Sequence, residues 1–559
     1  MRFKRFSIHI IFMCALNFFL ISPAFSANYY VKNGGNDNAN GLSDANAWAT
    51  IAKVNNVAAA HGFHDGDTIN FKRGSTWSND QTLGKAGSII NWGTINGLTI
   101  QDYGSGALPR LDGNTQEPIL IVASGISNLT IKNLDCSGQD WPTDYSYGNA
   151  TIYYVNGLTV DGLYIDGHKG SSIYNNHPGA LTIQTVGGNI EIKNCTIKNM
   201  FKDTFANTYS DWGSSDCPGI FFWNENGGKT SGTVNIHDNT ITNIYSDAIG
   251  AEGLLTTTNI YNNTVSGFGE EFVDTKGSRY INVYNNDISW NNFGSTPGES
   301  YWGATVFAGT TSPVTGEQAI GYYTFHDNYV HDSALVCIRQ AASVGLDVYN
   351  NYFKDVGLAY VADVGVRNQK FYNNVIVQTA PAGSSTAINS STYKSGVAVR
   401  ENTSGIEIYN NSFYISSSNH NYGIYLYNGA GAKVEKNIIQ MTRNSSSVYP
   451  IYSAGTGPAI SYNDYYNANQ SNRAYENGRT YNSTQLSSWI SAGHTGALFS
   501  NPMFSNVQAE DFSLSQASPC ILSNMTLGAL NLPLSVMNNT PANDSLAPPK
   551  GLTIVIGSN

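Results

Sequence analysis

Three evenly spaced segments decide the fold: Phe325-His-Asp-Asn-Tyr-Val330, Val348-Tyr-Asn-Asn-Tyr-Phe353 and Phe371-Tyr-Asn-Asn-Val-Ile376. Each places an apolar residue, a ring and two amide or acid residues before a pair of strand-forming residues. The second of the two amide or acid residues is an Asn at positions 328, 351 and 374, so the period is 23 residues.

The same phrase recurs along most of the chain. Further copies end at Asn133, Asn194, Asn239, Asn263, Asn286, Asn411 and Asn437. The interval from Asn286 to Asn328 is 42 residues, which fits one unit with an insertion at Phe293–Gln318 or nearly two units. No helical period lies between the copies. A unit this short cannot bury its own apolar face, so successive units must stack.

Stacking of such units predicts an all-β fold, a single-stranded right-handed parallel β-helix. Inward Ile, Val and Leu would align in columns from coil to coil. Asn at one fixed phase suits a left-handed turn, and its side-chain amide can hydrogen-bond the next coil. A β-propeller is excluded because its blades need about 40 residues each.

The ends of the chain differ from the repeat. Arg2, Lys4 and Arg5 precede an apolar run over Ile8–Ile21 and small residues up to Ala27, which predicts a secretory signal peptide. A short amphipathic helix after Asp44 is expected to cover the first coil. The predicted divisions are 1–27 signal peptide, 28–90 N-terminal cap and first strands, 91–466 β-helix, 467–535 irregular C-terminal cap and 536–559 flexible tail.

Composition restricts the class of function. The chain has 29 Lys+Arg against 40 Asp+Glu, a net charge of −11, and only 12% of its residues are charged. This charge argues against a nucleic-acid partner, and the 41% hydrophobic content argues against disorder. We expect a secreted monomer, extracellular or periplasmic, with no membrane segment after the signal. Its cysteines are interpreted as small buried hydrophobic residues.

Charged residues recur at nearly the same position within each repeat unit. Glu252, Asp274, Lys276, Asp363 and Arg400 each lie 10 to 12 residues before the Asn that ends their unit. Stacked coils are about 4.8 Å apart, so these side chains would line one groove. Carboxylates from two adjacent coils would offer hard oxygen ligands, which suit Ca²⁺. The predicted metal ligands are Asp247, Glu252, Glu270, Glu271 and Asp274.

Two terminal segments resemble secreted β-helix proteins of the pectate-lyase superfamily. They are Tyr29–Asp37 with Gly41–Ile51, and Asn501-Pro-Met-Phe504 with the later Ser518-Pro519. Together with the coils, the resemblance covers nearly the whole mature chain. It implies the fold specifically, while its members include lyases, hydrolases, epimerases and binding proteins.

The segment from Glu270 to Ser278 resembles the base-carrying strand of alginate- and chondroitin-type lyases. The resemblance implies that Lys276 is the base, that Glu271 and Asp274 bind metal, and that Arg339 fills the second basic role. Arg279 would help Lys276 and Arg339 to make the groove locally positive. The sequence departs from that pattern because Arg339 is about two coils from Lys276 unless Phe293–Gln318 is wholly an insertion. A solvated patch of ion pairs is the alternative interpretation.

Aromatic residues in the interrupting segments suggest a sugar-binding groove, since rings stack on sugar faces. The predicted substrate-binding residues are Trp212, Trp223, Tyr301, Trp302 and Arg400. The alternative is that these rings pack loops against the barrel.

The sequence as a whole predicts an exported enzyme that cleaves an acidic polysaccharide by β-elimination, assisted by Ca²⁺. Two rivals stay open. A glycoside hydrolase would use two of Asp247, Glu252, Glu271 and Asp274 as acid and base. A non-catalytic glycan-binding or surface protein would need none of these residues for chemistry. An epimerase that shares the proton abstraction is also compatible.

Overall fold

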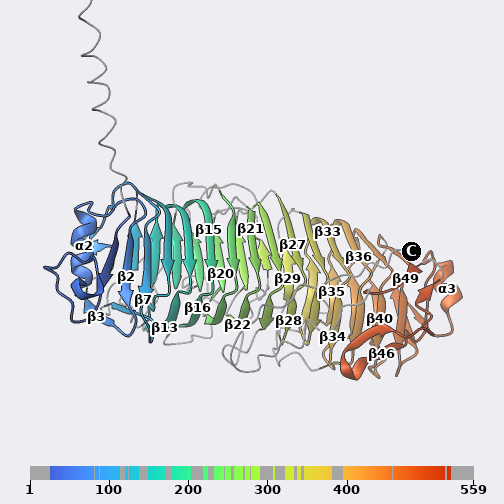
Figure 1. Cartoon of the computed structure of the whole chain (residues 1–559). Helices are drawn as coiled ribbons and strands as arrows, with labels where there is room; N and C mark the ends of the chain where they lie inside the picture. The colour runs from blue at the N-terminus through green and yellow to red at the C-terminus, as the bar shows by residue number, and fades with distance from the viewer. Residues whose placement is uncertain are drawn as a thin grey trace, which may run out of the picture.

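The computed structural model is a solenoid whose strands stack along one axis (Figure 1). It describes residues 26–80, 82–86, 88–113, 120–123, 125–137, 149–170, 179–184, 186–202, 218–223, 232–244, 246–252, 257–268, 271–276, 279–289, 306–308, 321–332, 336–340, 345–379, 394–455, 457–522 and 525–529. The predicted signal segment therefore lies outside the described residues up to position 25.

Sheet A forms the longest wall of the solenoid and is parallel throughout. Its strands, in spatial order, are β1 (Asn28–Val31), β2 (Thr68–Lys72), β7 (Thr99–Tyr103), β10 (Ile126–Lys132), β12 (Asn156–Asp161), β15 (Gly187–Lys193), β18 (Val234–His237), β21 (Thr257–Tyr261), β24 (Tyr280–Tyr284), β27 (Tyr322–His326), β30 (Gly345–Tyr349), β33 (Arg367–Tyr372), β36 (Ser404–Tyr409), β39 (Ala432–Glu435) and β42 (Ala459–Ser461), while β6 (Ile95–Asn96) pairs beside β10.

Sheet B follows sheet A in each coil after a two-residue turn. Its strands are β13 (Tyr164–Gly170), β16 (Thr196–Lys202), β19 (Thr240–Ile244), β22 (Thr264–Phe268), β25 (Asp287–Ser289), β28 (Tyr329–His331), β31 (Tyr352–Lys354), β34 (Val375–Gln378), β37 (Ser412–Ile415), β40 (Ile438–Met441) and β43 (Asp464–Asn467).

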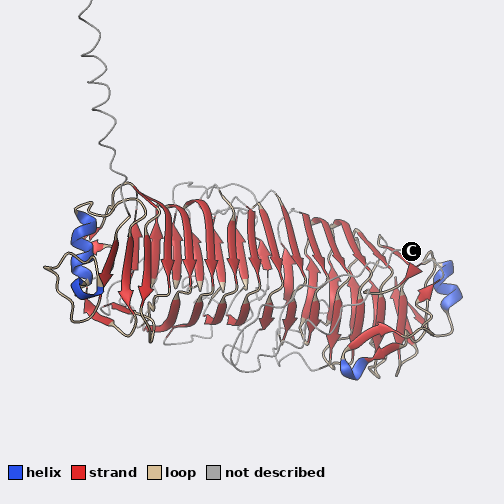
Figure 2. Ribbon diagram, in the orientation of Figure 1, coloured by secondary structure: helices blue, strands red, loops and turns tan. Residues whose placement is uncertain are grey.

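Sheet C closes each coil and leads back to sheet A. Its strands are β9 (Leu120–Ala123), β11 (Ala150–Tyr153), β14 (Leu181–Gln184), β17 (Ile220–Trp223), β20 (Ile249–Glu252), β23 (Val273–Lys276), β26 (Val306–Ala308), β29 (Val336–Gln340), β32 (Leu358–Ala362), β35 (Ser395–Val399), β38 (Tyr422–Leu426), β41 (Tyr449–Ser453), β44 (Asn472–Glu476) and the antiparallel β45 (Arg479–Asn482). Three parallel sheets visited in turn confirm the predicted β-helix (Figure 2).

Apolar columns fill the interior, as the repeat predicts. On sheet A one column runs through consecutive strands in register, and each member is almost completely buried: Ile236, Ile260, Val283, Phe325, Val348, Phe371, Ile408, Val434 and Ile460. Burying each such side chain stabilises the fold by about 1.5–3 kcal/mol.

At the turn from sheet A to sheet B, two adjacent residues have different structural roles. The first adopts a left-handed conformation, as at Asn350 with φ 56°. The second, Asn351, is buried, and its Oδ1 accepts from the backbone N–H and the amide of Asn328, at 3.0 and 3.1 Å. We expected one Asn to perform both functions; the structure divides them between neighbours. The buried ladder runs through Asn239, Asn263, Asn286, Asn328, Asn351, Asn374, Asn411, Asn437 and Asn463.

Both ends of the solenoid carry a helix (Figure 2). At the N-terminal end, α2 (Ile51–Ala59) begins after Thr50, whose side chain accepts from the Lys53 amide, and buries Ile51 and Val54. At the other end, α3 (Leu486–Ser491) inserts Trp489, which is fully buried and stacks on His494. The N-terminal helical cap is thus confirmed.

The predicted C-terminal cap includes a hairpin that lies on the side of the solenoid rather than over its end. The hairpin β46 (Phe504–Asn506) and β47 (Asp511–Leu514) packs Phe512 near Tyr352 and Tyr414 on the outer face of sheet B. No helix among the described residues is both long and apolar enough to cross a bilayer.

The described cysteines fit the interpretation from sequence. Cys136, Cys195, Cys337 and Cys520 are buried and form no disulfide among the described residues. Burial raises the pKa of the Cys136 thiol, so it behaves as a small core residue.

Candidate functional site

Most of the predicted site residues that the structure describes lie on the strands of sheet C or directly beside them. On β23, Val273 is completely buried in the core, so alternation directs Asp274 to the other face of the strand. Asp274 pairs in register with Gly250 of β20 and with Phe307 of β26. Its exposed fraction is only 7%, so this carboxylate sits in a covered part of the sheet surface.

Glu252 and Lys276 occupy paired backbone positions on β20 and β23. Trp223 of β17 pairs with Glu252, so three predicted site residues follow one another across neighbouring strands. The side chains of these three residues are outside the described part of the structure. The register nevertheless fixes their backbone positions about 4.8 Å apart from strand to strand.

Asp247 and Glu271 lie one coil apart, each just before its sheet C strand. Both are nearly buried, and the backbone N–H of Glu271 donates to Asp247 Oδ1 at 3.1 Å. The Asp247 carboxylate thus ties two successive coils together at the corner that leads into sheet C. Glu270 is outside the described residues.

The carboxylates do not assemble into a metal centre as far as the structure describes them. No group of three or more His, Cys, Asp or Glu side chains suited to a metal ion occurs among the described residues, and these include Asp247, Glu271 and Asp274. Glu252 and Glu270 do not enter this test because their side chains are not described. Calcium binding therefore stays a prediction.

Two arginines meet one aspartate further along sheet C. Arg339 of β29 donates from Nε and Nη2 to Asp363 Oδ2 at 2.9 and 2.7 Å. Arg400, which follows β35, donates from Nη1 to Asp363 Oδ1 at 3.1 Å. Burial would raise the pKa of Asp363, but the Val364 amide and the two guanidinium groups outweigh it and lower that pKa. Asp363 is therefore ionised and holds both arginines in place.

The long interval before Asn328 is a single coil. Within it, β26 pairs with β23 on one side and with β29 on the other. The segment Phe293–Gln318 therefore contributes one strand of sheet C, and Arg339 lies two strands from Lys276, a separation of about 10 Å along the axis. The departure from the lyase pattern noted in the sequence remains.

Arg279 belongs to a different part of the surface. It follows β23 at the corner toward sheet A, and its carbonyl accepts from the backbone N–H of Tyr322 at 3.0 Å. Its backbone is thus at the edge of sheet A rather than on sheet C. Of the remaining predicted residues, Trp212, Tyr301 and Trp302 lie outside the described part of the chain.

Sequence reasoning assigned no role to Asp363. The signal was present, because Asp363 and Arg400 both lie 11 residues before the last Asn of their units. Equal phase predicts equal position on neighbouring strands, and the register of β32 with β35 places the two residues side by side. The spacing did not show that Arg339, which lies 12 residues before the last Asn of its unit, contacts the same carboxylate.

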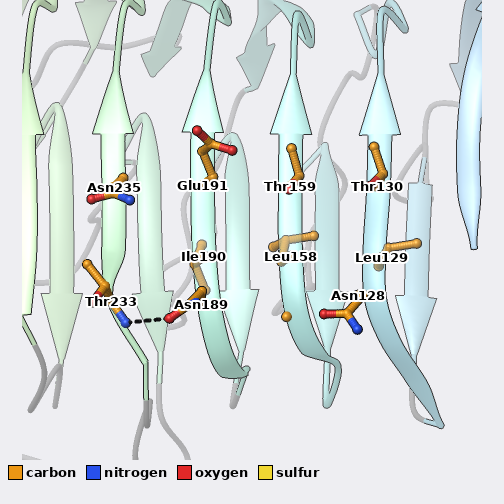
Figure 3. Close-up of a pocket in the computed structure, with 11 residues that line it drawn as sticks. Asn128, Leu129, Thr130, Leu158, Thr159, Asn189, Ile190, Glu191, Thr233 and Asn235 are labelled. Carbon is orange, nitrogen blue, oxygen red and sulfur yellow. Dashed lines mark hydrogen bonds between the residues drawn. The ribbon is translucent and has the colours of Figure 1, made fainter. Parts of the chain in front are cut away.

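A shallow groove also occurs on sheet A, away from these residues (Figure 3). Its volume is about 500 Å³, and it crosses β10, β12, β15 and β18, with Thr130, Thr159 and Glu191 on neighbouring strands. Glu191 is paired with His237 Nε2 and Lys193 Nζ, each at 3.2 Å. Its one carboxylate among the described lining residues is paired with a histidine and a lysine, so these residues do not provide the pair of carboxyl groups that a glycoside hydrolase needs.

No protein-family model matches the chain, and no curated protein sequence matches it. Similar solved structures include an alginate lyase from Paenibacillus sp. str. FPU-7, with 16% identity over 59% of this chain and 98% of the other and a TM-score of 0.38. A tailspike protein of E. coli bacteriophage HK620 has 13% identity over 78% and 77%, with a TM-score of 0.43. PfbA, a surface adhesin of Streptococcus pneumoniae, has 11% identity over 82% and 93%, with a TM-score of 0.42. At these values the similarity carries no argument about activity, which has to come from the residues themselves.

Proposed function

We propose that this β-helix protein is an exported polysaccharide lyase that acts on an acidic, uronate-containing chain along the outer face of sheet C. The observation that carries the proposal is the register of β20 with β23, which pairs the backbone positions of Glu252 and Lys276 beside Asp274. A positioned lysine can serve as the general base that removes the proton beside a uronate carboxylate once a cation engages the neighbouring carboxylates.

The chemistry follows from that assignment. Lys276 takes the proton at C5 of the uronate, and the electron pair of the C5–H bond forms the C4–C5 double bond. The C4–O glycosidic bond breaks, and its oxygen takes a proton from water. The substrate carboxylate stabilises the developing negative charge when a cation faces it. Arg339 or a bound Ca²⁺ would supply that cation, and the Asp363 contact keeps the Arg339 guanidinium oriented.

Ultraviolet absorbance of the unsaturated product tests the reaction. The protein is incubated with polyuronates and glycosaminoglycans, with and without a chelator. We expect absorbance to rise with at least one acidic polymer, and Lys276→Ala to reduce the rate about 10²- to 10⁴-fold. Lys433→Ala is the matched control because Lys433 lies on sheet A, is 52% exposed and pairs with Glu435. Equal activity of the two variants would contradict the role of Lys276.

A glycoside hydrolase is the second candidate, and one observation favours it. Three buried carboxyl groups on two adjacent coils, those of Asp247, Glu271 and Asp274, offer candidates for the acid and the base of a hydrolase. The net charge of −11 also disfavours attraction of a polyanion. New reducing ends without ultraviolet absorbance would identify this reaction. Binding without either product would identify a glycan-binding protein.

A further inference from the structure

Six tyrosines gather on sheet C beyond the arginine cluster. They come from three consecutive coils, on or directly after β38, β41 and β44: Tyr422, Tyr425, Tyr427, Tyr449, Tyr452 and Tyr475. We call this set the tyrosine face. Tyr425 is 9% exposed, and the other five are half-buried.

The rings form a connected surface rather than a single file. Tyr425, Tyr452 and Tyr475 stack face to face, with centroids 4.9 and 4.3 Å apart and planes within 5°. The flanking rings are tilted against this stack, Tyr422 by 57° and Tyr449 by 64° relative to Tyr452. The three stacked rings face one another, and the tilted rings pack against the side of this stack.

On sheets A and B, the same coils carry side chains of a different kind. On sheet A they carry Glu407, Lys433 and Glu435 as a charged surface. On sheet B, Tyr414 packs against Phe512 of the C-terminal hairpin, and Ile438 lies in one apolar cluster with Leu514 and Leu522. Coil stacking alone therefore does not require tyrosine on the outer side of these strands, and the tyrosine face differs in chemistry from both neighbours.

The tyrosine face continues directly from the candidate site. The guanidinium carbon of Arg400 lies 5.8 Å from the ring centre of Tyr427, and Arg400 also contacts Asp363. On the two preceding strands, Val361 and Ala398 hold the same register position as Tyr425 and are buried with it in one apolar cluster. One row of register-paired residues thus runs along the solenoid axis from Arg339 to β44.

We propose that the tyrosine face binds a stretch of saccharide chain that extends along sheet C from the candidate site. The inference rests on the proposed function for the direction of the chain and deepens it by assigning a distal binding surface. Phenol hydroxyls donate and accept hydrogen bonds, as sugar hydroxyls do, and ring faces pack against the C–H surfaces of sugars. All six side chains are neutral phenols, so the surface suits the uncharged parts of the polymer.

Burial keeps the Tyr452 hydroxyl protonated. It raises the pKa of that group, and the neighbouring Tyr475 raises it further. Tyr452 therefore keeps its hydrogen-bond donor at neutral pH.

The most specific test removes tyrosine hydroxyl groups while it keeps the stacked rings. In the Lys276→Ala background, binding is measured by affinity electrophoresis in gels with alginate, pectate, hyaluronan or chondroitin sulfate. We expect Tyr452→Phe combined with Tyr475→Phe, and separately Tyr427→Ala, to weaken binding of the retained polymer about tenfold. The matched control is Tyr349→Phe with Tyr372→Phe, a stacked pair at 5.0 Å on sheet A.

The outcomes separate this inference from the proposed reaction. Tyrosine-dependent binding without any turnover supports the tyrosine face and refutes the lyase. Turnover with unchanged binding in both tyrosine variants overturns the inference and leaves the lyase standing. Equal weakening in the sheet A control, or no retention by any polymer, also overturns it. With an active enzyme, we expect the tyrosine variants to raise KM for long chains and to leave kcat unchanged.

Discussion

Each coil assigns different tasks to two adjacent residues at the turn from sheet A to sheet B. Asn350 supplies a left-handed backbone, which Asn tolerates better than most residues. Asn351 supplies hydrogen bonds: its Nδ2 donates to the Phe325 carbonyl at 2.9 Å and to Asn374 Oδ1 at 3.0 Å. Because both functions favour asparagine, the sequence shows a doublet whose members are not equivalent.

Substitution of the two neighbours is expected to have unequal effects. Asn351→Ala leaves the Asn328 amide and the Phe325 carbonyl buried without their partner, and each such group costs about 1–3 kcal/mol. Asn350→Gly keeps a residue that accepts a φ of 56°, so its effect on the free energy of unfolding should stay within about 1 kcal/mol. Urea unfolding followed by circular dichroism compares them. Equal destabilisation would mean that the ladder adds no stability beyond the turn.

Substitution of Asp363 is the most direct test of the candidate site. Asp363→Asn removes the charge that holds Arg339 and Arg400, and we expect kcat/KM to fall about ten- to a hundredfold through misplacement of the guanidinium groups. Glu401→Gln is the control, since Glu401 contacts only the outer nitrogen of Arg400 at 3.4 Å. A loss of the same size in the control would show general damage to the cluster rather than a positioning role for Asp363.

At the scale of elements, periodicity predicts strands well and insertions poorly. The 23-residue phrase was enough to predict the parallel coils, because every coil must bury the same apolar columns. It left the segment Phe293–Gln318 open between an insertion and a further coil. The structure finds β26 there, a strand of three residues whose pairing with β23 and β29 is the only cue to its place. Such a short strand has no period of its own to detect.

The candidate site was predictable only where it follows the repeat. Asp363 and Arg400 share a phase and do lie together, while Arg279 belongs to a corner whose geometry no repeat specifies. The tyrosine face was missed because its members lie on several strands, and only the register of β38 with β41 brings them together. Long-range neighbours on a solenoid depend on register, which a single unit does not encode.

At the scale of the whole molecule, the open end of the solenoid has to be closed, and one buried acid takes part. Asp464 of β43 accepts from the Ser500 backbone N–H at 3.0 Å and from the Cys520 thiol at 3.1 Å. It thereby joins the last coil of sheet B to the C-terminal segment. Burial, although opposed by these hydrogen bonds, raises the pKa of Asp464 to about 6.

That shift makes closure of the solenoid depend on pH. The carboxyl pKa is 3.8 in the unfolded chain and about 6 in the folded one, so the folded state binds this proton more tightly. The contribution of Asp464 to stability is thus complete below pH 4 and is lost as pH rises through 6. Two pKa units correspond to about 3 kcal/mol. Asp464→Asn should remove this dependence, because Asn is neutral at every pH and can still accept from Ser500.

The test compares the free energy of unfolding of the variant with that of the natural protein at two pH values. We expect Asp464→Asn to have nearly the same free energy of unfolding at pH 4 and a higher one at pH 7, measured by urea titration. Asp511→Asn is the control, a half-buried carboxylate in the same capping segment whose Oδ1 accepts from Ser513. A difference that does not change between pH 4 and 7 would mean that the buried acid is ionised in the folded protein. In that case the hydrogen bonds of Ser500 and Cys520, rather than a retained proton, would hold the end of the solenoid together.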